Sequence, residues 1–125
     1  MILASTLVYV AGPFSGADRG SVEANIARAA ARGIEVARLG ACPIVPHSNT
    51  SHPDYERVQP YKFWIAATLE MMRRCDALIT VPGWELSSGA RGEVNAMNDL
   101  EKPVFHELEA LASWLVQRER ELRDG

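Results

Sequence analysis

The sequence is poor in cysteine, has no excess of positive charge and contains no long hydrophobic run. Its two cysteines, Cys42 and Cys75, lie in separate apolar stretches without a CxxC spacing, which favours reduced, buried thiols over a disulfide. Thirteen Lys and Arg against sixteen Asp and Glu give a net charge of −3, so polymeric nucleic acid is not an expected partner. The longest apolar run near the start, residues 7–13, is too short to span a bilayer and lacks a basic flank. We therefore expect a cytoplasmic protein without a membrane segment.

The composition is that of one ordinary globular domain. The 125 residues are 47% hydrophobic and 23% charged, which is typical of folded chains and not of disordered tails or fibrous repeats. A chain of this length is too short for two independent cores. Residues 1–125 are therefore expected to form a single domain.

Short β-branched and aromatic runs alternate with longer segments of helical periodicity. Strands are expected at residues 7–11, 42–46, 77–81 and 103–105. Helices are expected at residues 21–40, 60–74, 88–100 and 107–122, with a polar loop at 47–59. Parallel strands need such long crossovers, so the alternation predicts a small doubly wound α/β fold, flavodoxin-like or Rossmann-like. Its parallel sheet is expected to have four to five strands with helices on both faces, and the common strand order 2-1-3-4 is assumed.

Several side chains of these helices have expected positions. Ser21 and Ser88 are expected to cap the first and third helices. The buried stripe of the first helix is expected to consist of Ile26, Ala30, Gly33 and Ala37. In the last helix the residues expected to be buried are Leu108, Leu111, Leu115 and Trp114.

Two loops at the carboxyl ends of strands 1 and 3 are the expected ligand-binding elements, because the chain reverses direction between these strands. The first loop contains Gly12, Pro13, Phe14, Ser15 and Gly16 just before a helix, where free N–H groups and the helix dipole favour an anion such as phosphate. It has neither the Gly-Lys-Ser/Thr pattern typical of ATP-binding loops nor the G-x-G-x-x-G pattern typical of dinucleotide-binding loops. A tight turn without a ligand is the alternative.

The stretch from Ser87 to Glu93 is the most informative part of the sequence. Gly89 and Gly92 in the first turn of a helix cost roughly 1 kcal/mol each relative to Ala, so their missing side chains should serve a purpose. Helical side chains lean toward the N-terminus, which would hang the Glu93 carboxylate over these small residues, next to a substrate. The alternative is tight helix–sheet packing by the glycines, with Glu93 in solvent.

Three other features have mainly structural interpretations. Asp76, just before strand 3, is expected to cap a backbone group or pair with Arg73 or Arg74. His47 and His52 lie after strand 2 but lack the further ligands of a zinc site, so no metal or other cofactor is expected. Trp84 could either stack on a base or cover the edge of the sheet.

The sequence resembles the nucleoside 2-deoxyribosyltransferase superfamily, and most closely its small branch that includes nucleoside 5′-monophosphate N-glycosidases. The resemblance extends from Val8 to about Met97. The motifs that carry it lie at residues 9–16, 43–47, 75–79, 82–85 and 88–93.

The resemblance implies a function for the two loops. Glu93 would be the nucleophile and Tyr9 would orient it. The residues expected to bind a nucleoside or nucleotide are Gly12, Phe14, Ser15, Gly16, His47, Trp84, Ser88 and Gly89. A carboxylate attacking C1′ forms a covalent glycosyl-enzyme through an oxocarbenium-like transition state, after which water gives hydrolysis and a second base gives transfer. The resemblance also implies a homodimer or larger homo-oligomer.

One position departs from the family pattern. The aspartate that helps the leaving base is replaced by Thr68, which cannot donate a proton as a carboxylic acid does. Asp54, Glu85 or a residue of a neighbouring subunit could take over this role. The alternatives are a nucleotide-binding module without turnover and a structural oligomer in which Trp114 and the last helix form an interface.

Overall fold

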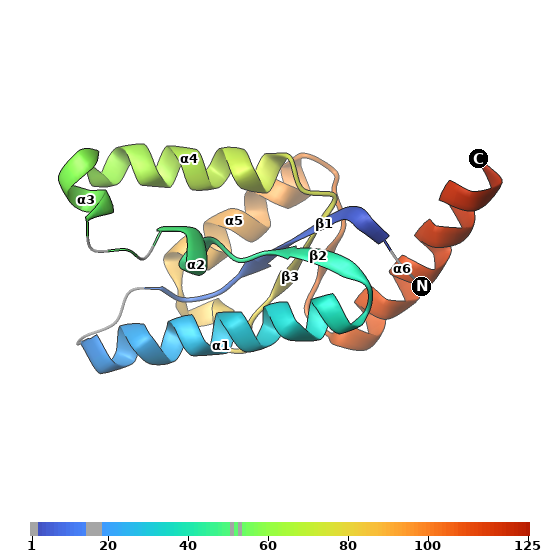
Figure 1. The fold of residues 1–125 in the computed structure, drawn as a ribbon, viewed down its shortest axis with the longest axis horizontal. Helices are drawn as coiled ribbons and strands as arrows, with labels where there is room; N and C mark the ends of the chain where they lie inside the picture. Colours follow the sequence, from blue (N-terminus) through green and yellow to red (C-terminus); the bar gives the residue numbers. More distant parts are fainter. Residues whose placement is uncertain (1–2, 15–18, 51, 53) are drawn as a thin grey trace.

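The computed structural model describes residues 3–14, 19–50, 52 and 54–125, and it confirms the predicted fold class (Figure 1). The strands are β1 (Leu3–Ala11), β2 (Ala41–Ile44), β3 (Ala77–Thr80) and β4 (Val104–Phe105). The helices are α1 (Arg19–Arg38), α2 (Pro46–Thr50), α3 (Tyr55–Val58), α4 (Tyr61–Arg73), the 3-10 turn η1 (Trp84–Leu86), α5 (Ser88–Asp99) and α6 (Leu108–Asp124). All strand pairs are parallel, and the sheet order is β2-β1-β3-β4, as predicted.

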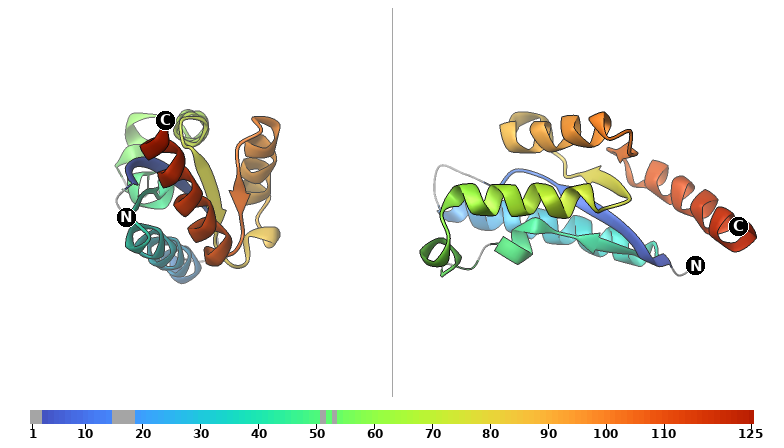
Figure 2. Two further views of the ribbon diagram at one scale, coloured as in Figure 1. Left: turned by 90° about the vertical axis from the view of Figure 1, so that its right-hand side faces the viewer. Right: turned by 90° about the horizontal axis from the view of Figure 1, so that it is seen from above.

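The sheet separates two hydrophobic clusters. Val8 and Val10 of β1 point into the cluster that α1 and α6 cover, whereas Tyr9 and Ala11 point into the cluster that α4 and α5 cover. Helices therefore lie on both faces of the sheet (Figure 2). These four β1 residues are completely buried, as expected for a central strand that is covered on both faces.

Gly12 lets the ends of β1 and β3 approach each other closely. A Cβ at this position would lie 2.8 Å from Cβ of Val81. Any larger residue would therefore push apart the two strand ends between which the chain reverses direction.

The buried stripe of α1 differs from the prediction. Gly33 is buried as expected, but Ile26 and Ala30 are half-buried and Ala37 is exposed. The other buried positions are Asn25, Ala29, Arg32 and Val36. Two of these residues, Asn25 and Arg32, are polar. Arg32 can be buried because its guanidinium donates to the carbonyls of Thr80 and His106 at 3.0 and 2.9 Å. Hydrophobic periodicity cannot identify a stripe that includes an arginine and an asparagine.

Helix boundaries also shift at two predicted caps. The first helix begins at Arg19, so Ser21 lies inside it and is not its cap. Ser88 is the first residue of α5, and the cap is Ser87, whose Oγ accepts the N–H of Ala90 at 3.2 Å.

The expected loop at 47–59 contains two short helices, α2 and α3. Tertiary contacts stabilise the second: the Tyr55 and Trp64 rings stack with centroids 4.9 Å apart, and Trp64 Nε1 donates to the carbonyl of Tyr55 at 3.1 Å. The polar composition of this segment indicates a loop, and it cannot reveal these contacts because Trp64 belongs to the next helix, α4.

Asp76 is structural and caps a backbone group, in agreement with one of the two expectations, but its ion-pair partner differs from those expected. Its Oδ2 accepts the N–H of Leu7 at 2.7 Å, and its Oδ1 lies 3.2 Å from Nη2 of Arg118 on α6. The predicted partners Arg73 and Arg74 pair with Glu70 instead, at 3.5 and 3.1 Å. Asp76 thus joins the amino end of the sheet to the last helix.

In α6, Leu111 and Leu115 are buried, whereas Leu108 and Trp114 pack against the cluster from its edge. The Trp114 ring contacts Phe105 at 5.7 Å and lies under the Arg118 guanidinium, so it is engaged within the chain.

Both cysteines are free, but only Cys75 is buried. Burial, followed by the nearby Asp76, raises the pKa of the Cys75 thiol to about 11. Cys42 is half-buried, which corrects the expectation of two fully buried thiols.

Within the described ranges, every helix is too short or too polar to cross a lipid bilayer.

Candidate functional site

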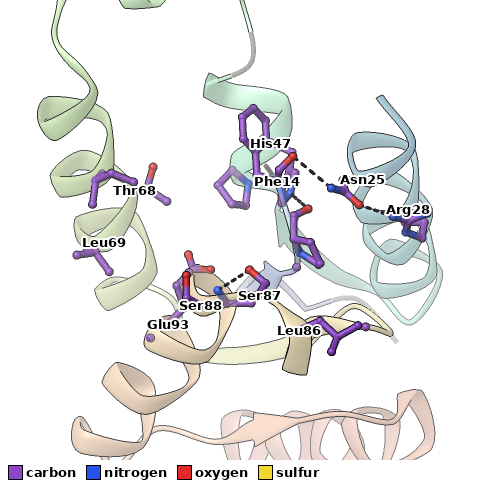
Figure 3. Close-up of a pocket in the computed structure, with 18 of the residues that line it drawn as sticks. Phe14, Asn25, Arg28, His47, Thr68, Leu69, Leu86, Ser87, Ser88 and Glu93 are labelled. Carbon is purple, nitrogen blue, oxygen red and sulfur yellow. Dashed lines mark hydrogen bonds between the residues drawn. The ribbon is translucent and has the colours of Figure 1, made fainter. Parts of the chain in front are cut away.

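A pocket of about 990 Å³ lies at the carboxyl ends of β1 and β3. One wall is α4, the opposite wall is the first half of α1, and the N-terminus of α5 forms the floor between them (Figure 3). Its volume is at the upper end of the usual range for small-molecule sites. The pocket occupies the position that the strand order predicts for a ligand.

Glu93 lines this pocket and is held from behind by Tyr9, which is not itself part of the lining. Tyr9 lies on β1 and is completely buried, and its phenol donates a short hydrogen bond to Oε2 of Glu93. Burial, reinforced by the adjacent carboxylate, raises the pKa of Tyr9, so it remains a donor over the whole accessible pH range. The pair joins the strand and the helix that sequence analysis identified.

The Glu93 carboxyl is held partly out of water. Burial raises its pKa from 4.5 to about 7, and the hydrogen bond from Tyr9 opposes this rise because it favours the charged form. At neutral pH the group is therefore divided between carboxylate and carboxylic acid. A carboxyl group with this pKa in a pocket is typical of a functional site.

The packing of α5 aims Glu93 into the pocket. Ala90, Val94 and Met97 form the buried stripe of this helix. Glu93 and Gly89 lie one turn apart beside that stripe and both line the pocket. The positions of Glu93 and Gly89 agree with the prediction that the Glu93 carboxyl lies over small residues at the edge of the sheet.

Packing within the chain does not explain the glycines of α5. A Cβ at Gly92 would have no atom within 4 Å, and a Cβ at Gly89 would approach only Ser87 Oγ, at 3.8 Å. Both residues are exposed and line the pocket. Of the two sequence-based interpretations, close approach of a ligand therefore fits better than tight helix–sheet packing.

Two pocket residues on α1 were not singled out from the sequence. Asn25 is 6% exposed and its amide donates to the carbonyl of Phe14 at 3.3 Å, while its side-chain oxygen accepts a hydrogen bond from Arg28. Arg28 thus places a cation in the pocket, across from the N-terminus of α5 with Ser87 and Ser88 (Figure 3). The available signal was an Asn-x-x-Arg spacing, which puts the two side chains on one helix face, but many exposed helices contain such pairs.

His47 lines the pocket and is 4% exposed. Its Nε2 lies 2.8 Å from the carbonyl oxygen of Pro13, which can only accept, so Nε2 carries the proton. Burial lowers the pKa of His47 and keeps the ring neutral. Its Nδ1 is a buried acceptor without a partner among the described residues.

Thr68 also lines the pocket, on the α4 wall. Its hydroxyl donates to the carbonyl of Trp64 at 2.7 Å. The proposed substitutes for the missing aspartate do not reach this place: Asp54 pairs with Arg57 at 3.3 Å, and Glu85 is not part of the lining. Among the described lining residues, Glu93 is the only carboxylate.

The remaining predicted residues divide into three groups. Gly12, Phe14, Ser88 and Gly89 line the pocket as expected. Trp84 does not: its indole stacks on His106 with ring centroids 4.8 Å apart, so it covers the sheet edge. Ser15 and Gly16 lie outside the described residues.

In the described part of the chain, no group of three His, Cys, Asp or Glu side chains is placed to hold a metal ion.

Fold and site together define a small doubly wound α/β protein with a tyrosine-bound carboxyl group in a pocket at the strand reversal. The chain belongs to the family described as Domain of unknown function (DUF1937), which matches residues 6–109. This match covers every strand end and every helix that contributes to the pocket. A search of curated proteins gives no match.

Proposed function

We propose that the protein cleaves the N-glycosidic bond of a nucleoside or nucleoside 5′-monophosphate, with Glu93 as the nucleophile. The observation that carries this proposal is the hydrogen bond from buried Tyr9 to Glu93 inside a pocket of nucleotide size. The resemblance to the nucleoside 2-deoxyribosyltransferase superfamily supports it, because the motif that ends in Glu93 matches that of the nucleophile.

The reaction needs the ionised form of Glu93. Its carboxylate oxygen attacks C1′, the bond from C1′ to the base breaks, and a covalent glycosyl ester forms through an oxocarbenium-like transition state. Tyr9 orients the carboxylate and favours its charged form. Water then attacks C1′ and releases the sugar, or a second base attacks and a new nucleoside forms.

The two ends of the pocket suit the two ends of a nucleotide. The α4 wall and the adjoining part of α5 contribute apolar side chains, including Ile65, Leu69 and Ala96, against which a base can lie. The opposite end contains Arg28 and the N-terminus of α5, which favour an anion such as a 5′-phosphate. This orientation leaves C1′ near Glu93.

Release of free base from a panel of ribonucleosides, deoxyribonucleosides and their 5′-monophosphates tests the proposal. The wild type is expected to release base from at least one substrate, and Glu93→Gln is expected to lose this activity. Mass spectrometry of the quenched reaction should detect a glycosyl adduct on the peptide that contains Glu93. Equal base release by wild type and Glu93→Gln on every substrate would rule the proposal out.

A second candidate is a nucleotide-binding module without turnover. It is favoured by Thr68, whose hydroxyl proton is already engaged with the helix backbone and cannot assist a leaving base. Saturable nucleotide binding by calorimetry, with the ligand recovered intact after prolonged incubation, would support this candidate over catalysis.

We also infer a cytoplasmic location and a homo-oligomer, which stay proposals. Free Cys42 and Cys75 suit a reducing compartment. Exposed apolar side chains on α3 and α4, among them Val58 and Phe63, offer a surface for self-association. Sedimentation analysis of the wild type checks the assembly.

A further inference from the structure

On the α4 wall and around His47, the described polar side chains offer hydrogen-bond acceptors, and Glu93 is the only carboxyl group among the described lining residues. The Thr68 hydroxyl donates its proton in a hydrogen bond to the carbonyl of Trp64, 2.7 Å away, so its oxygen can only accept a hydrogen bond from a ligand. His47 donates its Nε2 proton to the carbonyl of Pro13, and its buried Nδ1 has no partner among the described residues. The phenol of Tyr61 lies at the rim, 70% exposed, and a phenol is a much weaker acid than a carboxyl group.

This pattern determines which base can leave. A neutral base departs from C1′ as an anion unless an acid protonates it, and such help is typically worth about 10²–10⁴-fold. Glu93 cannot supply that proton while it acts as the nucleophile. A base that already has a positive charge on its glycosidic ring departs as a neutral molecule and needs no acid.

We propose that the preferred substrate is a nucleotide whose base is cationic, either an N-linked pyridinium or an N7-alkylated purine. The inference rests on the proposed function and specifies its substrate class. Both kinds of base have the same chemistry at C1′, namely a positive ring that becomes neutral when the glycosidic bond breaks.

The charges of the pocket match such a molecule at both ends. A cationic ring beside Glu93 favours the carboxylate over the carboxylic acid, so the substrate itself promotes the nucleophilic form of a group with a pKa of about 7. At the other end, Arg28 and the start of α5 suit the phosphate. The Thr68 hydroxyl oxygen on the α4 wall suits an N–H donor of the base, such as a carboxamide or an exocyclic amine.

The reaction balances without any further reactant than water. The Glu93 oxygen forms a bond to C1′, the C1′–N bond breaks, and its electron pair neutralises the ring nitrogen. Water then adds its oxygen to C1′, the Glu93 carboxylate leaves, and one proton passes to solvent. The products are the neutral base, the sugar phosphate and a proton.

Matched substrate pairs test this inference on the wild-type protein. Nicotinamide mononucleotide is compared with its reduced, uncharged form, and 7-methylguanosine 5′-monophosphate with guanosine 5′-monophosphate; the common neutral ribo- and deoxyribonucleotides are included. Base release is followed by chromatography at pH 7.5 and corrected for uncatalysed hydrolysis. We expect kcat/KM for at least one cationic member to exceed that of its neutral partner by about 100-fold or more.

The outcomes separate this inference from the proposed function. Equal or faster release from neutral nucleotides would overturn the preference for cationic bases and leave Glu93-dependent cleavage standing. Release that does not exceed that of Glu93→Gln on any substrate, cationic or neutral, would overturn both.

Substitution of Thr68 provides a gain-of-function test. Thr68→Asp adds a carboxylic acid to the α4 wall, and Thr68→Asn is its matched control of the same shape without an acidic proton. The neutral-to-cationic ratio of kcat/KM should rise about 10-fold or more in the Asp variant relative to the Asn variant. An unchanged ratio in two folded variants would show that the missing proton does not limit neutral substrates, and would count against the inference.

Discussion

The raised pKa of Glu93 predicts that this residue makes the folded protein less stable as the pH rises. In the folded state the group titrates at about 7, and its ordinary value is 4.5. Between these values the folded protein keeps a proton that the unfolded chain has released, so stability falls with increasing pH. The full difference corresponds to about 3 kcal/mol, and most of it falls between pH 5 and pH 8.

Glu93→Gln removes this titration and keeps an oxygen that can accept the hydrogen bond from Tyr9. Urea unfolding of wild type and variant at pH 5, 6, 7 and 8 measures the difference in unfolding free energy at each pH. The unfolding free energy of the variant should rise by about 2–3 kcal/mol relative to that of the wild type between pH 5 and pH 8. Glu85→Gln, at an exposed glutamate of η1, is the control for loss of one negative charge. A wild-type-to-variant difference that does not change with pH would refute the buried carboxyl described here.

Three further predictions concern the same pocket. The kcat/KM of base release should rise with pH through about 7, as Glu93 ionises. Tyr9→Phe should move this rise to higher pH, because the hydrogen bond from Tyr9 favours the carboxylate and its loss raises the pKa of Glu93. An unchanged pH profile would show that Tyr9 does not stabilise the carboxylate. Arg28→Ala should raise KM by about 10- to 100-fold for a 5′-monophosphate and little for the nucleoside, since a charged hydrogen bond contributes about 1.5–3 kcal/mol. Equal effects on both substrates would contradict a phosphate site. Gly92→Ala should raise the unfolding free energy by up to about 1 kcal/mol while it weakens ligand binding, whereas Gly12→Ala should destabilise the fold, because its Cβ would meet Val81 at 2.8 Å. Thermal unfolding and calorimetry would check both glycine variants.

Most of the fold could be predicted from the sequence because its main signals are local. The run at 7–11 is apolar on both faces and is therefore a central strand, and the helices between strands require parallel pairing. The strand order then indicates which two loops meet at the ligand site. Each of these steps depends on periodicity or connectivity, and neither needs knowledge of side-chain contacts.

The errors occur where side chains from distant segments determine the local structure. Asn25 and Arg32 are buried because they donate to carbonyls of other segments, so the apolar pattern misplaced the inner face of α1. The second short helix after β2 depends on the stacking of Tyr55 on Trp64. The sequence leaves Trp84 either on a ligand or at the sheet edge, and its stacking on His106 places it at the edge. None of these partners can be identified from spacing along the chain.

The locally unfavourable features of this chain meet in one place. A half-ionised carboxyl is held beside a buried phenol, a buried imidazole nitrogen has no partner in the described part of the protein, and a helix begins with two glycines that no packing requires. Each costs stability, and a chain shaped only for stability would lose them through single substitutions. A ligand would satisfy all three at once, because it could approach the glycines, donate to the bare nitrogen and place positive charge beside the carboxylate. Their coincidence supports the proposal that this pocket binds a small molecule, independent of any sequence resemblance.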